Sequence, residues 1–400
     1  MRRRGALAVL LLTASVGLVG WTGLVGWTGL VGWTVPGVGL GASELDLASA
    51  TVDPAEEPAY AWRLPNGFPA PRVPDDNKMS ELKVELGRRL FYDTRLSRDG
   101  TMSCATCHGQ ALAFSDGRAR SIGVTGELHP KSSMSLANVA YAPTLTWDDP
   151  KMVSLEEQLL TPLFGHEPVE MGLRGPSQLR ERLSGDWQLE LHFKAAFPEN
   201  PVISASNAAK AIAAFERTLI SGDSAFDRYL YGNEPTALDA SSRRGMRLFF
   251  SNRLGCSECH GRFIFAGAVH FEGSRDHGPQ FHNTGLYDLG EGRYPDENPG
   301  LVRHTGEAAD RGRFKTPSLR NVELTAPYMH DGSILTLEAV IAHYEAGGRA
   351  PGNPFKSPAM TGFHLSCDER QDLLAFLRSL TDLSFVQDER FAAPPGDSQF

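Results

Sequence analysis

Apolar residues recur at helical intervals along much of this chain, and this pattern predicts a mainly α-helical protein. Leu82, Leu86 and Leu90 are spaced four residues apart, so they fall on one face of an α-helix. A capping box from Ser366 to Glu369 predicts the start of the last helix. Three further apolar faces are formed by Ala208, Ile212, Phe215 and Leu219, by Leu337, Ile341 and Tyr344, and by Leu373, Phe376, Leu377 and Leu380. Segments that alternate apolar and polar residues are few, so strands are not expected.

One stretch of sequence occurs twice, which indicates an internal duplication. Residues 87–92 read Gly-Arg-Arg-Leu-Phe-Tyr, residues 245–250 read Gly-Met-Arg-Leu-Phe-Phe, and an Arg-Leu pair follows each copy. We therefore expect two domains of the same kind. The predicted segments are a leader at 1–50, a Pro-rich stretch at 51–74, a first domain at 75–222, a linker at 223–238, a second domain at 239–385 and a tail at 386–400.

Each copy of the repeat leads into a pentapeptide with the spacing of c-type haem attachment. In such a site two cysteines bind the porphyrin and the histidine that follows ligates iron. A zinc ribbon would place its second cysteine pair about 15–20 residues after the first, whereas the pairs here lie in different halves of the chain. A redox-active pair would not need a histidine after both second cysteines. We expect two covalent haem c groups, held by Cys104, Cys107 and His108 and by Cys256, Cys259 and His260.

Two haem sites and few strands together predict an all-α protein of two cytochrome c-like domains. Buried haem would supply much of each core. A fifth cysteine, Cys367, has no partner at haem spacing. We interpret it as a buried thiol that is not a ligand.

Composition indicates the compartment. The chain has 400 residues, 41% of them hydrophobic, and a formal net charge of -9, which suits two ordinary domains and disfavours nucleic acid as a partner. Residues 2–4 are Arg, and residues 5–43 carry no charge. This start is typical of a secretory signal, although the apolar run is also long enough for a membrane anchor. We favour cleavage and a periplasmic location, because c-type haems are attached outside the cytoplasm.

These features make the chain similar to the bacterial di-haem cytochrome c peroxidase/MauG family. The resemblance covers roughly residues 75–383 and rests on the paired haem sites and three motifs. The motifs read Leu-Glu-Glu-Gln at 155–158, Pro-Val-Glu-Met-Gly at 168–172 and Arg-Asn-Val-Glu-Leu-Thr-Ala-Pro-Tyr-Met-His-Asp-Gly at 320–332. The resemblance implies reaction with hydrogen peroxide at the haem of His108.

The resemblance also implies that the first haem lacks a sixth ligand. Ordinary members have a Ser-Ile-Gly-His loop whose histidine must leave iron before peroxide binds, whereas residues 121–124 here read Ser-Ile-Gly-Val. Val124 cannot coordinate iron, so we expect a five-coordinate haem that needs no reductive activation. The alternative is that another residue, such as His129, moves in.

Tyr344 aligns with the position that supplies the sixth ligand of the second haem. Peroxidases of the family have Met there, and MauG has Tyr. Tyrosinate is an anionic ligand, formed when iron lowers the phenol pKa from about 10, and it favours oxidised iron. Core packing is the alternative role for a tyrosine on an apolar helical face. His343 and Met329 are the rival ligands.

The resemblance assigns the distal pocket of the first haem as well. It implies that Glu170 is the acid/base that moves a proton between the peroxide oxygens, that Gln158 is its hydrogen-bonding partner, and that Pro162 limits the space over iron. Gln158 and Glu170 are two residues further apart here than in the peroxidases compared, so their geometry is left open.

Two further roles follow from the same alignment. Trp147 matches a tryptophan between the haems and is expected to relay electrons, with a structural indole as the alternative. MauG has another tryptophan where this chain has Leu254, so the same electron route is not expected. The carbonyls of Thr325 and Pro327 match calcium ligands, with Ser132 at the position of an expected asparagine.

We expect a periplasmic enzyme that stores two oxidising equivalents of hydrogen peroxide across both irons. The substrate would be a residue, typically Trp, of a partner protein, as in MauG-like enzymes encoded beside methanobactin genes, which residues 281–383 resemble. The alternative is a cytochrome c peroxidase that takes electrons from a small cytochrome or cupredoxin. A third reading is a non-catalytic electron carrier with two six-coordinate haems.

Overall fold

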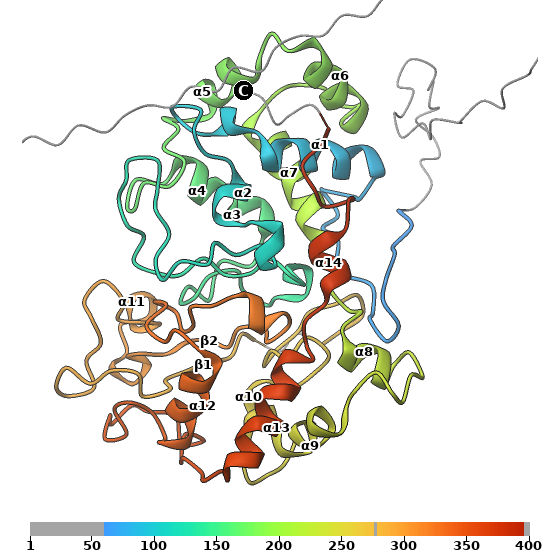
Figure 1. Cartoon of the computed structure of the whole chain (residues 1–400). Coiled ribbons are helices and arrows are strands. Elements are labelled where there is room, and N and C mark those ends of the chain that lie inside the picture. The colour runs from blue at the N-terminus through green and yellow to red at the C-terminus, as the bar shows by residue number, and fades with distance from the viewer. Residues whose placement is uncertain (1–59, 276–277, 396–400) are drawn as a thin grey trace, which may run out of the picture. The chain divides into compact units, whose positions relative to one another are not determined.

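The computed structural model describes residues 60–275 and 278–395 (Figure 1). The predicted leader at 1–50 lies outside the described residues. Within the described ranges, no helix combines the length and apolar character needed to cross a bilayer.

Short helices joined by long loops make up most of the structure. The first half contains α1 (Glu81–Tyr92), α2 (Cys104–Cys107), α3 (Leu155–Gln158), α4 (Leu160–Phe164), α5 (Pro176–Leu183), α6 (Trp187–Ala196) and α7 (Ala205–Arg217). The second contains α8 (Ala225–Leu230), α9 (Ala240–Phe249), α10 (Cys256–Cys259), α11 (Val302–Thr305), α12 (Leu337–Glu345), α13 (Cys367–Arg378) and α14 (Leu383–Gln387).

One feature departs from an all-α fold. The two-residue strands β1 (Phe281–His282) and β2 (Phe314–Lys315) form an antiparallel ribbon in which Phe281 lies opposite Lys315. Strands this short are too brief for an alternating sequence pattern to show them.

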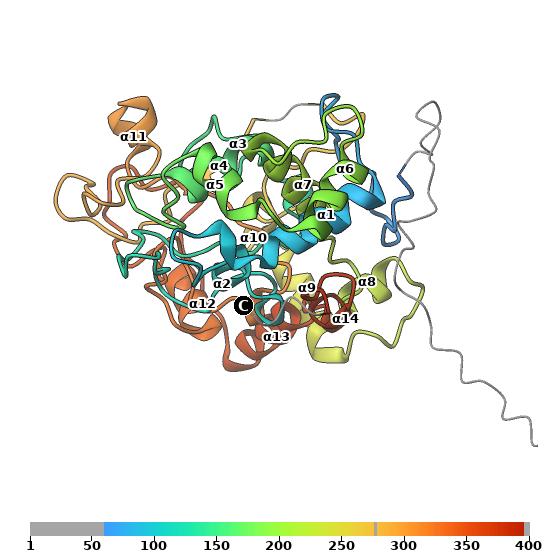
Figure 2. The ribbon, with the colours of Figure 1, turned by 90° about the horizontal axis from the view of Figure 1, so that it is seen from above.

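Each half is organised around one pair of crossing helices, α1 with α7 and α9 with α13. Figure 2 shows the same two pairs from above. A Cβ atom on Gly87 would lie 1.9 Å from the carbonyl oxygen of Ala211, and one on Gly245 would lie 1.9 Å from that of Asp372. Only glycine permits such close crossings.

The two halves contain equivalent hydrogen bonds as well as equivalent helix crossings. Asn138 Oδ1 accepts from the N–H of Ser221 at 3.1 Å, just after α7. Asn321 Oδ1 accepts from the N–H of Asp382 at 2.8 Å, just after α13. Each asparagine therefore ties a loop to the segment that follows the long helix of its own half.

The predicted helical faces are buried as expected for amphipathic helices. Leu86 and Leu90 of α1 and Ile212 and Phe215 of α7 are all 0% exposed. Side chains at the N-caps define where these helices begin: the Ser80 hydroxyl accepts from the N–H of Lys83. The Ser366 to Glu369 capping box is present at the start of α13, but α13 is not the last helix as predicted, because the short helix α14 follows it.

The interpretation of Cys367 as a buried thiol is wrong, because Cys367 is exposed. It is the first residue of α13, ahead of the buried face that begins at Asp372. The predicted linker at 223–238 also differs from a plain connection, since it contains α8, whose Phe226 is buried. The domain boundaries themselves stay predictions.

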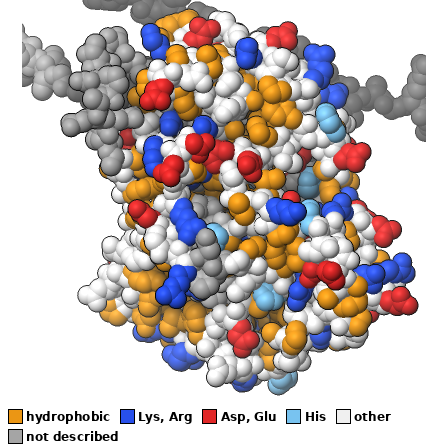
Figure 3. All heavy atoms as spheres, turned by 180° about the vertical axis from the view of Figure 1, so that it is seen from behind, with side chains coloured by type: hydrophobic (Ala, Val, Ile, Leu, Met, Phe, Trp, Pro, Cys, Tyr) orange, Lys and Arg blue, Asp and Glu red, His pale blue; other side chains and the backbone are white. Residues whose placement is uncertain are grey.

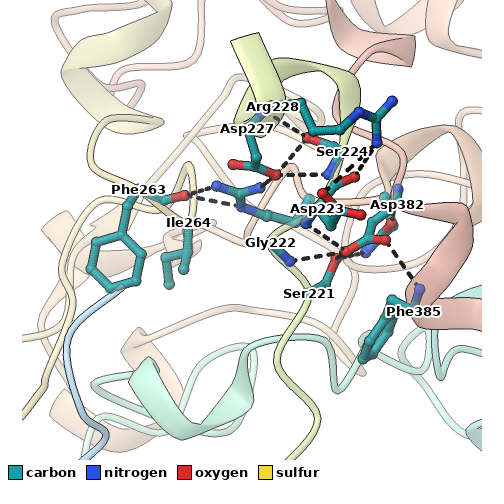
Figure 4. A network of polar contacts seen from close by, with 12 residues as sticks. Ser221, Gly222, Asp223, Ser224, Asp227, Arg228, Phe263, Ile264, Asp382 and Phe385 are labelled. Carbon is teal, nitrogen blue, oxygen red and sulfur yellow. Dashed lines mark hydrogen bonds and ion pairs between the residues drawn. The ribbon is translucent and has the colours of Figure 1, made fainter. Parts of the chain in front are cut away.

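A polar network joins this linker region to the C-terminal part of the chain (Figure 4). Asp382 Oδ2 accepts from the Ser221 hydroxyl at 3.0 Å and from the N–H groups of Gly222 and Asp223, both at 2.9 Å. Asp382 Oδ1 accepts from the N–H of Phe385 at 3.0 Å. This network fixes the start of α14, and the Phe385 ring then lies 5.5 Å from that of Phe114 in the first half.

The surface carries charges of both signs. On the face shown in Figure 3, acidic and basic side chains are interspersed with apolar ones. The excess of negative charge in the composition is therefore not gathered into one patch on this face.

Candidate active site

Both pentapeptides form a single helical turn, α2 and α10, followed directly by the histidine. The N–H of His108 donates to the carbonyl of Cys104 at 3.0 Å, and that of His260 donates to the carbonyl of Cys256 at 2.8 Å. Residues three apart in a helix share a face, so one turn presents both thiols on the same side. The four thiols are partly buried and form no disulfide. The local structure suits two thioether bonds at each site.

The two histidine rings are held alike by contacts to backbone carbonyls. His108 Nδ1 lies 2.9 Å from the carbonyl oxygen of Phe114, and His260 Nδ1 lies 3.2 Å from that of Phe265. When Nδ1 donates to a carbonyl, Nε2 is left as the neutral ligand atom. Burial lowers the pKa of both imidazoles, that of His260 to about 4. Both rings are therefore held neutral, as metal ligation requires.

A mostly apolar cavity adjoins the second pentapeptide. It is lined by Cys256, Cys259 and His260 and also by Lys315, whose burial lowers its pKa to about 8. Among the described residues, no acidic side chain forms an ion pair with Lys315. Apolar walls suit the haem macrocycle, and an amine without an acidic partner suits a haem propionate. The residues present therefore fit a covalent haem, and Lys315 is a site residue that the sequence reasoning missed because no motif marks it.

Tyr344 lies on the face of α12 that also carries Ile341, and both line this cavity. Burial raises the phenol pKa well above its usual range, so in the absence of a metal the group is neutral. Of the rival ligands, Met329 lines the cavity, whereas His343 is not among the described lining residues. His343 Nδ1 instead accepts from the N–H of Arg349 at 3.2 Å.

The predicted distal residues of the first haem are held together by backbone contacts. The N–H of Val124 donates to the carbonyl of Glu170 at 2.8 Å, and the N–H of Met171 donates to that of Pro162 at 2.9 Å. A Cβ atom on Gly123 would lie 1.8 Å from the carbonyl oxygen of Val169. The loop that carries Val124 is thus packed tightly against the segment that carries Glu170.

The Glu170 side chain is 35% exposed, and burial raises its pKa to about 7. His129 Nε2 lies 3.7 Å from Glu170 Oε1. The sequence named His129 only as a replacement ligand and gave no sign of this pairing. Gln158 ends α3, four residues before Pro162. No hydrogen bond between its amide and Glu170 is found within the described residues.

Trp147 bridges the two halves of the chain. Its indole Nε1 donates to the carbonyl of Ser132 at 2.8 Å, and its own carbonyl accepts from the N–H of Lys315 at 2.8 Å. Trp147 lines the cavity of the second site, and so does Leu254. The indole is therefore placed beside the second haem site, with a structural hydrogen bond to the first half.

The residues predicted to hold calcium also lie at this cavity. Thr325, Pro327 and Ser132 all line it. In the part of the chain that the structure describes, no cluster of three or more His, Cys, Asp or Glu side chains is arranged to hold a metal ion. A calcium ion here would depend on carbonyl and hydroxyl oxygens, and the site stays a prediction.

Comparison with known proteins gives consistent results. Residues 81–235 match the family described as di-haem cytochrome c peroxidase. The chain is 35% identical to the methylamine utilization protein MauG of Methylorubrum extorquens over 83% of this chain and 88% of that protein. It is 36% identical to a cytochrome-c peroxidase of Pseudomonas sp. (strain SCT) over 78% of this chain and 84% of that protein.

A solved structure is similar over the same region. The crystal structure of a MauG-like protein associated with microbial copper homeostasis superimposes with a TM-score of 0.81. It is 45% identical in sequence, and the match covers 84% of this chain and 99% of that chain.

Proposed function

Because this chain belongs to the di-haem cytochrome c peroxidase/MauG family and is a peroxidase-type oxidoreductase, we propose that it uses hydrogen peroxide to oxidise a tryptophan of a periplasmic partner protein. Two haem c groups, which the family implies, supply the redox chemistry. We further propose that they occupy two cytochrome c-like domains formed by duplication, and that a calcium ion lies near Thr325 and Pro327.

The observation that carries this proposal is the position of Tyr344 in the cavity of His260. A phenol at this point can coordinate iron as tyrosinate, because the positive charge of iron offsets the burial that raises the pKa of Tyr344. An anionic ligand stabilises oxidised iron, whereas a neutral thioether stabilises reduced iron. Tyr344 therefore favours storage of oxidising equivalents over rapid return to the reduced state.

The residues around Glu170 support the peroxide reaction. Val124 offers no ligand atom, and its N–H holds the Glu170 segment in place. With a pKa raised to about 7, the Glu170 carboxylate can take a proton from the near oxygen of peroxide and return it to the departing one. Pro162, which adjoins this segment through Met171, is expected to limit the space for larger ligands.

The alternative function is a cytochrome c peroxidase that draws electrons from a small redox protein. Met329 supports this candidate, because it also lines the second cavity and offers a thioether. The two functions differ in the fate of the oxidising equivalents. In oxidation of a partner tryptophan they persist until the partner binds, whereas in a cytochrome c peroxidase electrons from a small redox protein rapidly reduce them.

The test uses holoenzyme matured in a periplasm. Fully ferric protein, without prior reduction, is mixed with one equivalent of hydrogen peroxide and followed by electron paramagnetic resonance and optical spectroscopy. We expect a high-spin ferric signal beside a low-spin one at rest, and loss of both after mixing. A resting enzyme with only low-spin iron, or one that reacts only after reduction, would contradict the proposal and favour the ordinary peroxidase.

A second arm addresses the substrate. A secreted tryptophan-containing protein encoded beside the gene is incubated with enzyme and peroxide and analysed by mass spectrometry. Modification at tryptophan supports the proposal. Rapid turnover with reduced cytochrome c, without modification of that protein, supports the alternative.

A further inference from the structure

A series of ring side chains leads away from the cavity of the second haem site. Phe314 and His330 stack with their centroids 3.6 Å apart, and both line the cavity. The Tyr294 ring, which lines the cavity too, lies 6.1 Å from that of Phe314 and 6.3 Å from that of His330. The Tyr287 ring follows at 5.5 Å from Tyr294. Tyr287 is partly exposed and is followed by three exposed residues, 288–290. The series therefore runs from the cavity to the surface.

The two tyrosines differ in what their hydroxyls contact. The Tyr294 hydroxyl donates to the amide oxygen of Asn283 at 2.8 Å and accepts from the N–H of Leu286 at 3.0 Å. An amide cannot take up the phenolic proton. The Tyr287 hydroxyl donates to Asp331 Oδ2 at 2.6 Å, and a carboxylate can take it. One-electron oxidation of a phenol releases a strongly acidic proton, so Tyr287 is much easier to oxidise than Tyr294.

Asp331 is prepared to act as this base. Hydrogen bonds from the Tyr287 hydroxyl and from the N–H of Ser333 favour its ionised form. Asp331 Oδ1 accepts from the N–H of Ser333 at 3.1 Å, which leaves Oδ2 for Tyr287. Burial and the hydrogen bond to Asp331 raise the pKa of the Tyr287 phenol, and Arg349 offsets this only in part, so Tyr287 keeps its proton until it is oxidised. The carboxylate is therefore both ionised and correctly placed.

We propose that Tyr287 relays oxidising equivalents from the second haem site to a partner protein at the surface, with Asp331 as its proton acceptor. This inference rests on the proposed function and names the exit point for its oxidising power. Leu254, directly before the second pentapeptide, has an aliphatic side chain and cannot serve as a relay.

The Tyr287 phenol gives one electron, by way of Tyr294, to the peroxide-oxidised haem site and gives its proton to Asp331, leaving a neutral phenoxyl radical. The partner residue then gives one electron to Tyr287, and Asp331 returns the proton. Two such cycles use the two oxidising equivalents of one hydrogen peroxide, and Tyr287 and Asp331 end unchanged.

The test follows the radical rather than turnover. Holoenzyme made with ring-deuterated tyrosine and with ordinary tyrosine is mixed with hydrogen peroxide without partner, and electron paramagnetic resonance is recorded over time. We expect a tyrosyl signal whose hyperfine splitting changes with deuteration. Tyr287→Phe should reduce that signal by about tenfold or more, and Asp331→Asn should slow its appearance by about tenfold, since loss of a positioned base typically costs at least this much.

Tyr92→Phe is the matched control, because Tyr92 lies on α1 and its hydroxyl donates to the backbone carbonyl of Phe391 at 2.7 Å and not to a carboxylate. This variant should keep the wild-type signal. Haem content and melting temperature of each variant separate relay loss from misfolding. An undiminished tyrosyl signal in Tyr287→Phe would overturn the relay, even where the ferric haem signals are still lost. Failure of wild-type ferric haems to react would instead sink the proposed function.

Discussion

His129 Nε2 lies 3.7 Å from Glu170 Oε1 in the predicted distal pocket of the first haem. The other ring nitrogen of His129, Nδ1, lies 3.1 Å from the backbone nitrogen of Lys131 and 3.2 Å from its carbonyl oxygen. These contacts anchor one side of the imidazole and leave Nε2 facing the carboxyl group. The separation is just beyond hydrogen-bond length, so the two groups interact mainly through their charges and dipoles.

Glu170 should give the peroxide reaction a pH dependence centred near 7. The ionised carboxylate is the form that accepts a proton from peroxide, and burial raises its pKa to about 7. The rate should therefore rise with pH through this value and level off above it. Glu170→Gln should lower the rate by about 10²–10⁴-fold, measured by stopped-flow mixing with peroxide. Glu157→Gln, at an exposed position of α3, should leave the profile unchanged, and a wild-type rate in Glu170→Gln would exclude the assigned role.

His129 should tune this profile. Burial lowers the pKa of His129, so at neutral pH its ring is an uncharged donor that stabilises the nearby carboxylate. His129→Ala should shift the midpoint of the pH profile upward and slow the reaction by roughly threefold to tenfold at pH 7. His304→Ala is a matched control, because His304 Nδ1 lies 3.8 Å from Asp149 Oδ1 outside this pocket. An unshifted midpoint in His129→Ala would show that the contact has no effect on Glu170.

Tyr344 should set the potential of the second haem. Tyr344→Phe should retain both haems but lose long-lived storage of oxidising equivalents. Tyr344→Met should raise the potential by about 100 mV or more, because a neutral thioether favours the ferrous state. The potentials of both variants are measured by potentiometry. Tyr328→Phe, which alters another tyrosine of the same cavity, is the control and should keep the native potential. Native potentials in both Tyr344 variants would mean that Tyr344 only packs and that Met329 is the ligand.

The close helix crossing in the second half should tolerate no side chain at Gly245. A Cβ atom there would lie 1.9 Å from the carbonyl oxygen of Asp372, so α9 and α13 must separate. Gly245→Ala should lower the free energy of unfolding by about 1–3 kcal/mol or more, measured by denaturant titration of the holoprotein. Gly352→Ala, where a Cβ atom meets nothing within 4 Å, should have little effect. Equal stability of the two variants would show that the helices shift apart freely.

Local chemistry explains which features could be predicted from the sequence. The two pentapeptides each lie within one helical turn and the histidine after it, so their residues and spacing alone predict the attachment sites. The Ser366 to Glu369 capping box and the buried positions of Leu86 and Leu90 likewise depend on neighbours within a turn or two. The two-residue strands and the helix inside the predicted linker left no such pattern.

The features of the candidate site that the sequence did not predict depend on contacts between residues far apart in the chain. His129 and Glu170 meet because the loop of Val124 packs on the segment after α4, and the pairing has no local signature. Lys315 was identified as a candidate site residue only from the fold, which places it in the lining of the cavity beside the second pentapeptide. His343 and Tyr344 are adjacent and equally plausible as ligands by residue type, yet one helical step of about 100° puts only Tyr344 into the cavity. Residue identity determined which candidate ligands the chain offers, and tertiary packing decided which of them line the cavity.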